Sequence, residues 1–147
     1  MTRLHTLLVA FLVGAVAVFG GGFRCAVLTG AEDNRDVERA VAEVDSLDVP
    51  PRISPTDTLT VRMYGMVGPN GCHSFERFDS ERSGDRVRVT PVVARVTGEE
   101  VACTMAVVPL DRTYAVAPPF EPGTFTVVVP QPDRTDVTAT VDVREAE

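Results

Sequence analysis

The sequence predicts an all-β protein, an antiparallel sandwich of about seven short strands preceded by a hydrophobic N-terminal helix. Apolar and polar residues alternate with a period of two in most segments after Arg52, which is the pattern of a strand with one buried face. Turn-forming residues recur between these segments, and no helix of useful length is expected after Pro51. The chain has many valines and no tryptophan, so its core is expected to consist mainly of valine.

Residues 1–30 are predicted to be a signal peptide or a membrane anchor. Arg3 lies in a short polar start, and residues 7–23 follow without a single charge. This arrangement directs export, so the rest of the chain is expected to be extracytoplasmic: secreted, periplasmic or anchored to the cell membrane. The segment would contact the membrane if it is not cleaved.

Three fates of this segment stay open. Cleavage is consistent with the small residues at positions 15 and 17, and residues 29–31 form a weaker site. Retention needs about 20 apolar residues, slightly more than residues 7–23 provide. Lipidation at Cys25 is the third fate, but the bulky and charged residues just before it depart from the pattern of bacterial lipoproteins.

Residues 31–49 are predicted to form a linker or a short helical stalk. Asp33 and Asn34 fit a helix cap, and the apolar residues that follow share one helical face: Val37, Ala40, Val41 and Val44. A loosely ordered linker is the alternative, because an isolated helix of this length is marginal in water. Pro50 and Pro51 end the segment in either case, so the domain is expected to span residues 50–147.

The clearest strands are expected at residues 58–64, 124–129 and 137–144, where alternate residues are apolar. A fourth strand is expected from the alternation within residues 101–107, and a short fifth strand at residues 114–116. These segments should contribute one face each to the core.

Two further strands are expected to be irregular. Residues 86–96 form the sixth, but their apolar positions change from odd to even at Pro91, which predicts a bulge or an edge position. Cys72, Phe75 and Phe78 are spaced three apart, which predicts a bulged strand over residues 72–80. Turn residues separate the strands at positions 68–71, 83–85, 98–99, 118–123 and 130–133.

The charge of the exported region argues against a nucleic-acid partner. Residues 31–147 hold 12 of the 14 basic residues and all 21 acidic ones, which gives a net charge of −9. No basic stripe is present that could displace the counterions of a nucleic acid or dock on anionic lipid. The acidic surface is explained by solubility through like-charge repulsion.

A resemblance supports the predicted architecture. The stretch Phe120-Glu-Pro-Gly-Thr-Phe-Thr-Val-Val-Val129 resembles the Pro-Gly-Thr-aromatic-x-Val pattern of immunoglobulin-like and fibronectin-III-like domains in exported bacterial proteins. The resemblance covers residues 50–145 and implies an immunoglobulin-like β-sandwich with no shared catalytic residues. Such domains serve as spacers, adhesion modules or accessory binding units. The chain departs from antibody-type domains because it lacks a core tryptophan, and Phe125 stands where a tyrosine is common.

Cys72 and Cys103 are predicted to form a disulfide, because pairing is usual in an oxidising compartment. Closing a loop of this size stabilises a fold by roughly 3–4 kcal/mol on the chain-entropy model. A metal site that includes His73 is the alternative, but two thiols and one imidazole leave zinc without a fourth ligand. We therefore expect no metal and no cofactor.

The sequence contains no pattern that indicates catalysis. A nucleophile needs a base within reach and a third group that orients the base, yet His73 is the only histidine after residue 30. No nucleophile elbow and no glycine-rich phosphate loop are found. The protein is therefore predicted not to be an enzyme.

A candidate binding patch follows from the loops, because loops on a rigid sandwich often carry recognition. Tyr64 is predicted to face outward on a polar side, directly before the 68–78 segment. The candidate contact residues are Tyr64, Asn70, His73, Phe75 and Arg77. The alternative is that a second sheet or the N-terminal helix covers Tyr64.

These observations favour two functions. The first is a non-catalytic exported or membrane-tethered protein with a structural or binding role at the cell envelope, whose partner is an unknown protein or glycan. The second is a secreted protease inhibitor that presents a stiff loop, formed by residues 118–122 or by the turn at residues 68–73. The first follows from the export segment, the two-residue alternation and the missing catalytic pattern, and the second from the proline-rich segment and the disulfide-braced turn.

Overall fold

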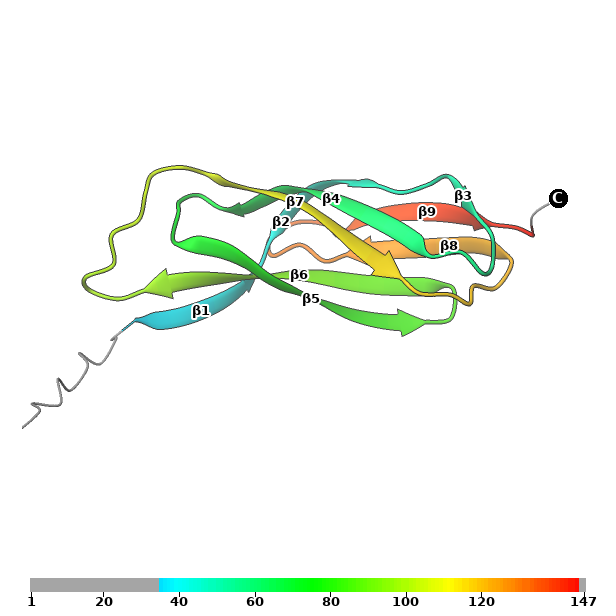
Figure 1. Cartoon of the computed structure of the whole chain (residues 1–147), viewed down its shortest axis with the longest axis horizontal. Coiled ribbons are helices and arrows are strands. Elements are labelled where there is room, and N and C mark those ends of the chain that lie inside the picture. Colours follow the sequence, from blue (N-terminus) through cyan, green and yellow to red (C-terminus); the bar gives the residue numbers. More distant parts are fainter. Residues whose placement is uncertain (1–34, 146–147) are drawn as a thin grey trace, which may run out of the picture. The chain divides into compact units, whose positions relative to one another are not determined.

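The computed structural model describes residues 35–145, which form nine strands and no helix (Figure 1). In chain order the strands are β1 (Asp36–Val41), β2 (Glu43–Asp48), β3 (Arg52–Ile53), β4 (Leu59–Gly68), β5 (His73–Ser83), β6 (Arg86–Thr97), β7 (Val108–Val116), β8 (Gly123–Val129) and β9 (Val137–Val143). The predicted hydrophobic helix at residues 1–30, with the candidate lipidation site Cys25, lies outside the described residues.

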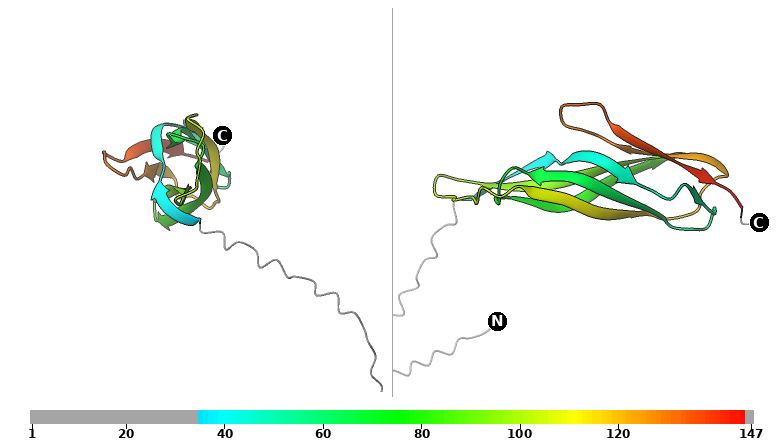
Figure 2. Two further views of the ribbon diagram at one scale, coloured as in Figure 1. Left: turned by 90° about the vertical axis from the view of Figure 1, so that its left-hand side faces the viewer. Right: turned by 90° about the horizontal axis from the view of Figure 1, so that it is seen from above.

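The strands form two sheets, which confirms the predicted all-β sandwich. Sheet B has three strands in the order β2-β4-β7. Sheet A has six, and the long strand β6 organises it. One edge of β6 pairs with β5, while β1 and β8 pair with different halves of its length and β8 continues to β9 and β3 (Figures 1 and 2).

The prediction of about seven antiparallel strands is wrong in number and in direction. Two of the nine strands, β1 and β2, lie in the segment predicted to be a linker or a short helical stalk, and sheet A is mixed because β6 pairs with β8, and β3 with β9, in parallel. Alternation reports which face of a strand is buried, but it carries no information about the direction of the neighbouring strand. Sequence periodicity therefore could not have distinguished these pairings.

Residues 36–48 form two strands instead of the predicted helical stalk or linker. β1 pairs antiparallel with β6, and β2 pairs antiparallel with β4, so the chain crosses between the sheets at the buried residue Ala42. Spacings of three and four residues fit a helix, but an isolated short helix is marginal, whereas β6 and β4 offer a complete ladder of hydrogen bonds. The sandwich therefore begins at β1 and not at residue 50.

Gly65 allows β2 to lie close against β4. A Cβ atom at this position would lie 2.0 Å from the backbone oxygen of Glu43, far inside van der Waals contact. The register of the two strands also shifts between Val44 and Ser46. A side chain at position 65 would therefore push β2 away from sheet B.

The core lies between the sheets and is built mainly from valine, as expected. In β4 the residues Leu59, Val61 and Met63 have no exposed area, and the residues between them are exposed. β8 and β9 provide further apolar residues of the core: Phe125, Val127, Val129, Val141 and Val143. The three strands with the clearest alternation in the sequence are thus confirmed.

The irregular strand predicted at residues 72–80 is confirmed as β5, but the expected change of face in β6 is wrong. The bulge lies in β5, between Phe75 and Arg77. On the opposite strand the inward positions remain odd through Pro91 to Val93, which is in the core. Val92 is buried on the other face of sheet A, where it lies between β1 and β5, and this created the false change of parity.

Arg82 holds the connection at residues 118–122 against the core, at the end of the sandwich where β5 meets β6. Its guanidinium donates a hydrogen bond of 2.6 Å to the carbonyl of Ala117 and another to the carbonyl of Pro119. The same group lies 4.5 Å from the ring centre of Phe120, which is buried. Arg82 therefore binds the backbone of this connection and packs against the ring of Phe120 at its centre.

Candidate functional site

The opposite end of the sandwich is formed by the turn between β4 and β5 and by the loop of residues 98–107 between β6 and β7 (Figure 1). We call the latter the 98–107 loop. It projects past the neighbouring turn in two perpendicular views (Figures 1 and 2). Arg35, where the described chain begins, lies at the same end.

Asn70 fixes the turn between β4 and β5. Its side-chain oxygen accepts a hydrogen bond of 3.1 Å from the backbone N–H of Cys72 and lies 2.9 Å from Nδ1 of His73. The backbone N–H of His73 also donates to the carbonyl of Asn70, at 3.2 Å. An asparagine that bonds to the backbone two residues later is a common way to fix a turn. The imidazole of His73 therefore has a structural partner.

The predicted disulfide between Cys72 and Cys103 joins this turn to the 98–107 loop. The two Cα atoms lie 5.2 Å apart, which is in the usual range for a disulfide. Beside it, the N–H of Gly71 donates a hydrogen bond of 2.9 Å to the carbonyl of Thr104. A Cβ atom on Gly71 would lie 2.1 Å from the Thr104 hydroxyl, so the absence of a side chain permits this close approach.

The strand predicted at residues 101–107 is absent, and these residues belong to the 98–107 loop. They have no neighbouring strand, because β4 ends at Gly68 and pairing with β7 begins only at Val108. The side chain of Met105 is 91% exposed and that of Val107 is 61% exposed. The alternation of apolar residues that predicted a strand therefore places apolar side chains in solvent.

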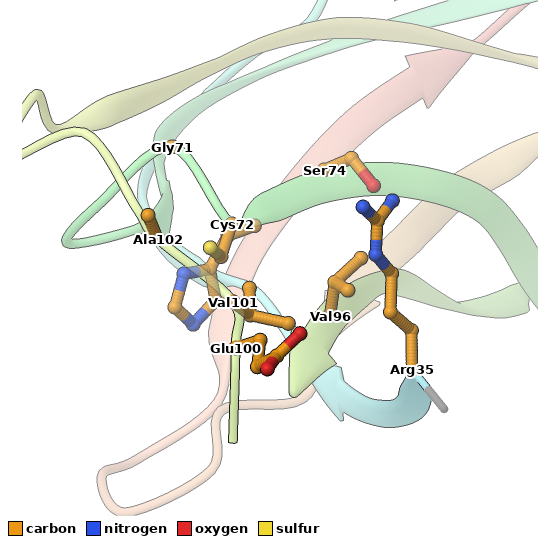
Figure 3. A pocket seen from close by; sticks show the side chains of 9 residues that line it. Arg35, Gly71, Cys72, Ser74, Val96, Glu100, Val101 and Ala102 are labelled. Atoms are coloured by element: carbon orange, nitrogen blue, oxygen red, sulfur yellow. The ribbon is translucent and has the colours of Figure 1, made fainter. Parts of the chain in front are cut away.

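A hollow of about 320 Å³ lies beside the disulfide at the base of the loop (Figure 3). The lining residues come from the turn, the end of β6, the loop and the start of the described chain: Arg35, Gly71, Cys72, His73, Ser74, Val96, Glu100, Val101 and Ala102. In Figure 3 the guanidinium of Arg35 points toward Ser74. Its lining combines the acidic group of Glu100, the basic group of Arg35, the imidazole of His73 and several apolar groups.

The structure does not bring the five predicted contact residues into one patch. Asn70 and His73 lie together in the turn. Tyr64 lies in β4 one residue after the buried Met63, so it faces away from the core, and the guanidinium of Arg62 lies 5.0 Å from the centre of its ring. It is half-buried and belongs to a different surface.

Phe75 and Arg77 are separated from the turn and from each other. The ring of Phe75 packs against Phe78 at a centroid distance of 4.8 Å and closes the side of the sandwich. Arg77 lies on the outer face of sheet A, where it pairs with Asp79 at 2.9 Å. The bulge in β5 turns these two residues to different faces.

The outer faces of both sheets carry paired charges. On sheet B, Arg62 makes two hydrogen bonds of 2.8 Å to the carboxylate of Asp111. This guanidinium lowers the pKa of Asp111, and the same bond raises the pKa of Arg62. On sheet A, Arg39 pairs with Glu76 at 2.9 Å. These charged groups are paired, whereas the 98–107 loop exposes the apolar side chains of Met105 and Val107.

The described residues show neither a metal site nor a membrane-spanning helix. Within residues 35–145, no three histidine, cysteine, aspartate or glutamate side chains are grouped so that they could hold a metal ion. The same part of the chain has no helix of the length and apolar character needed to cross a membrane.

Together these features define a small two-sheet β-sandwich with a disulfide-held apolar loop. Residues 61–143 match the ORF11 beta-sandwich domain, and because the match covers more than half of the chain, the chain belongs to this family. The matched range contains both cysteines of the disulfide and the whole 98–107 loop. No individual curated protein and no solved structure matches the chain.

The residues that sequence reasoning missed are Met105 and Val107. Both were assigned to a strand because they alternate with smaller residues. The sequence carries no signal against this strand, because the apolar residues alternate and residues 108–113 separate them from the strand predicted at residues 114–116. Only the structure shows that the next strand, β7, already begins at Val108.

Proposed function

We propose that the chain is a non-catalytic β-sandwich protein, exported or tethered to the membrane, that binds a protein or glycan at the cell envelope through the 98–107 loop. The observation that carries this proposal is the exposure of Met105 and Val107 on a loop held by a disulfide. Exposed apolar side chains on a fixed segment are characteristic of binding surfaces, because their burial provides energy without ordering the loop.

The extracytoplasmic location is supported by two independent features. Residues 7–23 have the length and composition of an export segment. The second feature is the Cys72–Cys103 disulfide, because disulfides persist in oxidising compartments and are rare in the cytosol. The proposal includes both a cleaved and a retained form of the segment.

We also propose that the domain is immunoglobulin-like. The Pro-Gly-Thr-Phe sequence at residues 122–125 leads into β8, as in the pattern that suggested the resemblance. The two facing sheets fit, whereas the parallel pairs β6–β8 and β3–β9 depart from an all-antiparallel arrangement. An experimental structure superimposed on immunoglobulin and fibronectin-III domains tests this, and a different order of strands in the sheets would contradict it.

The binding function is tested with the full chain, recovered from the extracytoplasmic fraction with its disulfide intact. It is screened against envelope proteins and glycans, and each hit is measured again with the double variant Met105→Gln/Val107→Thr. We expect saturable binding that this variant weakens at least about 30-fold, as for hot-spot anchors. The matched control is Val37→Thr, since Val37 is also an exposed valine, 49% exposed, but lies in β1. An affinity that is unchanged in the Met105→Gln/Val107→Thr variant would contradict the proposal. A hydrolase activity that is lost on His73→Ala would also contradict it.

Protease inhibition is the second candidate function. The 98–107 loop is better suited to contact a protease than the two loops that the sequence suggested, residues 118–122 and 68–73. Residues 118–122 are engaged by Arg82, and the 68–73 turn is closed by Asn70. The 98–107 loop is the longest exposed connection at the disulfide end and has a covalent attachment. Dose-dependent inhibition of a protease by micromolar protein would support this candidate, and its absence across a panel would exclude it.

A further inference from the structure

We propose that the 98–107 loop presents the Met105–Ala106 peptide bond, in the manner of a substrate, to a serine endopeptidase with an apolar S1 pocket, and that Met105 fills this pocket. The proposal rests on the second candidate function, protease inhibition, and names its contact residue and its partner class. Four features of the loop carry it.

The first feature is the accessible backbone around Met105. Proteases bind extended peptides largely through main-chain hydrogen bonds, as an added strand. Within residues 35–145, Met105 and Ala106 lie in no strand and take part in no backbone hydrogen bond. Their N–H and C=O groups are therefore available to an enzyme cleft, unlike those of the neighbouring strand β7.

The second feature is the attachment of the residues directly before Met105. Cys103 is bonded to Cys72, and the carbonyl of Thr104 accepts a hydrogen bond from Gly71. Fixing the backbone of one residue costs about 1–2 kcal/mol of conformational entropy. Because the domain has already fixed these two residues, the loop loses less entropy on binding than a flexible peptide substrate.

The third feature is the attachment on the other side of the bond. Val108, two residues after Ala106, is the first residue of β7 and pairs with Gly68 of β4. Both halves of the loop would therefore stay in place after the bond is cut. This distinguishes an inhibitor from a substrate, because a substrate releases its leaving segment.

The chemistry follows from these attachments. The serine oxygen attacks the Met105 carbonyl carbon, an ester forms, the Met105–Ala106 C–N bond breaks, and the catalytic histidine passes the proton to the Ala106 nitrogen. The new amine stays beside the ester because β7 holds it. It can attack the ester and restore the peptide bond with loss of the serine ester, so resynthesis competes with water and net hydrolysis is slow.

The fourth feature is the side chain itself. Met105 is the most exposed of the large apolar residues in the described part of the chain, at 91%. A methionine side chain is unbranched, flexible and uncharged, so it fits a deep apolar pocket and not a pocket with an acidic base. Residues 98–107 contain no arginine, which excludes a protease that selects basic residues.

The test uses the full chain from the extracytoplasmic fraction and a panel of chymotrypsin-like, subtilisin-like, elastase-like and trypsin-like proteases. We expect nanomolar to micromolar inhibition of enzymes with apolar S1 pockets, with slow cleavage at Met105–Ala106 only. Met105→Arg should weaken that inhibition at least about 30-fold, as for a hot-spot anchor, and should create inhibition of the trypsin-like enzyme. Val37→Thr, which changes an exposed apolar side chain in β1, should change neither.

Each other outcome overturns the inference. Inhibition that is indifferent to Met105→Arg would refute the role of Met105 while protease inhibition stands. No inhibition of any enzyme would refute both. Rapid, complete cleavage at Met105–Ala106 would make the loop a substrate. Sedimentation that shows a dimer dissociated by Met105→Gln would mean that a second copy of the chain covers the loop.

Discussion

Replacing Cys72 and Cys103 together by alanine is expected to lower the free energy of unfolding by about 3.7 kcal/mol. The two residues are 31 positions apart. On the chain-entropy model, a cross-link over a loop of that length removes about 12 cal/mol/K from the unfolded chain, which gives this value at 25 °C. Because a typical domain has a stability of about 5–15 kcal/mol, the loss is a large fraction of the total.

The assay is urea unfolding followed by circular dichroism. With a slope of about 1.5 kcal/mol per molar urea, the midpoint is expected to fall by about 2.5 M. The unmodified chain with its disulfide reduced is the matched control, because its two thiols keep the packing of the sulfur atoms. It should be destabilised by a similar amount, and any additional loss in the alanine variant measures packing.

A loss below about 1 kcal/mol in both samples would refute the reasoning, since it would mean that the cross-link barely restricts the unfolded chain. An increase in slope would indicate that the unfolded state had become more expanded. Measuring the slope and the midpoint together separates these two results.

Three further predictions concern other parts of the sandwich. Arg82→Ala should lower the free energy of unfolding by about 1–3 kcal/mol, because two hydrogen bonds to carbonyl groups are lost; an unchanged urea midpoint would contradict this. Gly65→Ala should destabilise by more than about 2 kcal/mol through its clash with β2, whereas Gly84→Asn, at a positive φ with open space around it, should have an effect below about 1 kcal/mol. In an NMR titration the carboxyl of Asp111 should show a pKa below the usual value of about 3.9. Its contribution to stability is present above the unfolded-state pKa and is lost as the pH falls through the lowered value; Arg62→Gln should return the pKa toward normal, and a normal pKa in the unmodified chain would exclude the interaction.

The parts of the fold that could be predicted are those in which a single strand carries its own signal. Leu59, Val61 and Met63 alternate strictly and are fully buried, so β4 was evident from the sequence. The bulge in β5 was also detectable, because Phe75 and Phe78 are out of phase for a regular strand but both pack at the core. These are local properties of the chain.

The parts that failed depend on neighbours distant in sequence. Residues 36–48 form strands because they pair with the edges of β6 and β4. The sequence of the segment alone does not indicate that these edges are available. Val92 is buried on the outer face of sheet A because β1 lies beside it. Its apolar character therefore led to the wrong prediction of a bulge at Pro91. Tertiary context of this kind overrides local patterns in strands more than in helices.

For the candidate site, covalent chemistry was predictable and surface geometry was not. The Cys72–Cys103 pair followed from two cysteines in a region that the sequence predicts to be exported. The patch that included Tyr64 and Arg77 failed, because closeness in sequence does not place residues on one face when a strand and a bulge intervene. The prediction that Met105 lies in a strand was wrong because it assumed that alternating apolar residues are buried, whereas Met105 is exposed.

The placement of the first and last strands has a mechanical consequence. β1 begins at the disulfide end and β9 finishes at the other end of the sandwich (Figure 1). A force that stretches the domain along this axis would slide β1 along β6, and it would load the hydrogen bonds of six residue pairs at the same time instead of breaking them one by one. A domain built in this way resists a force that pulls its first and last strands apart along the long axis of the sandwich.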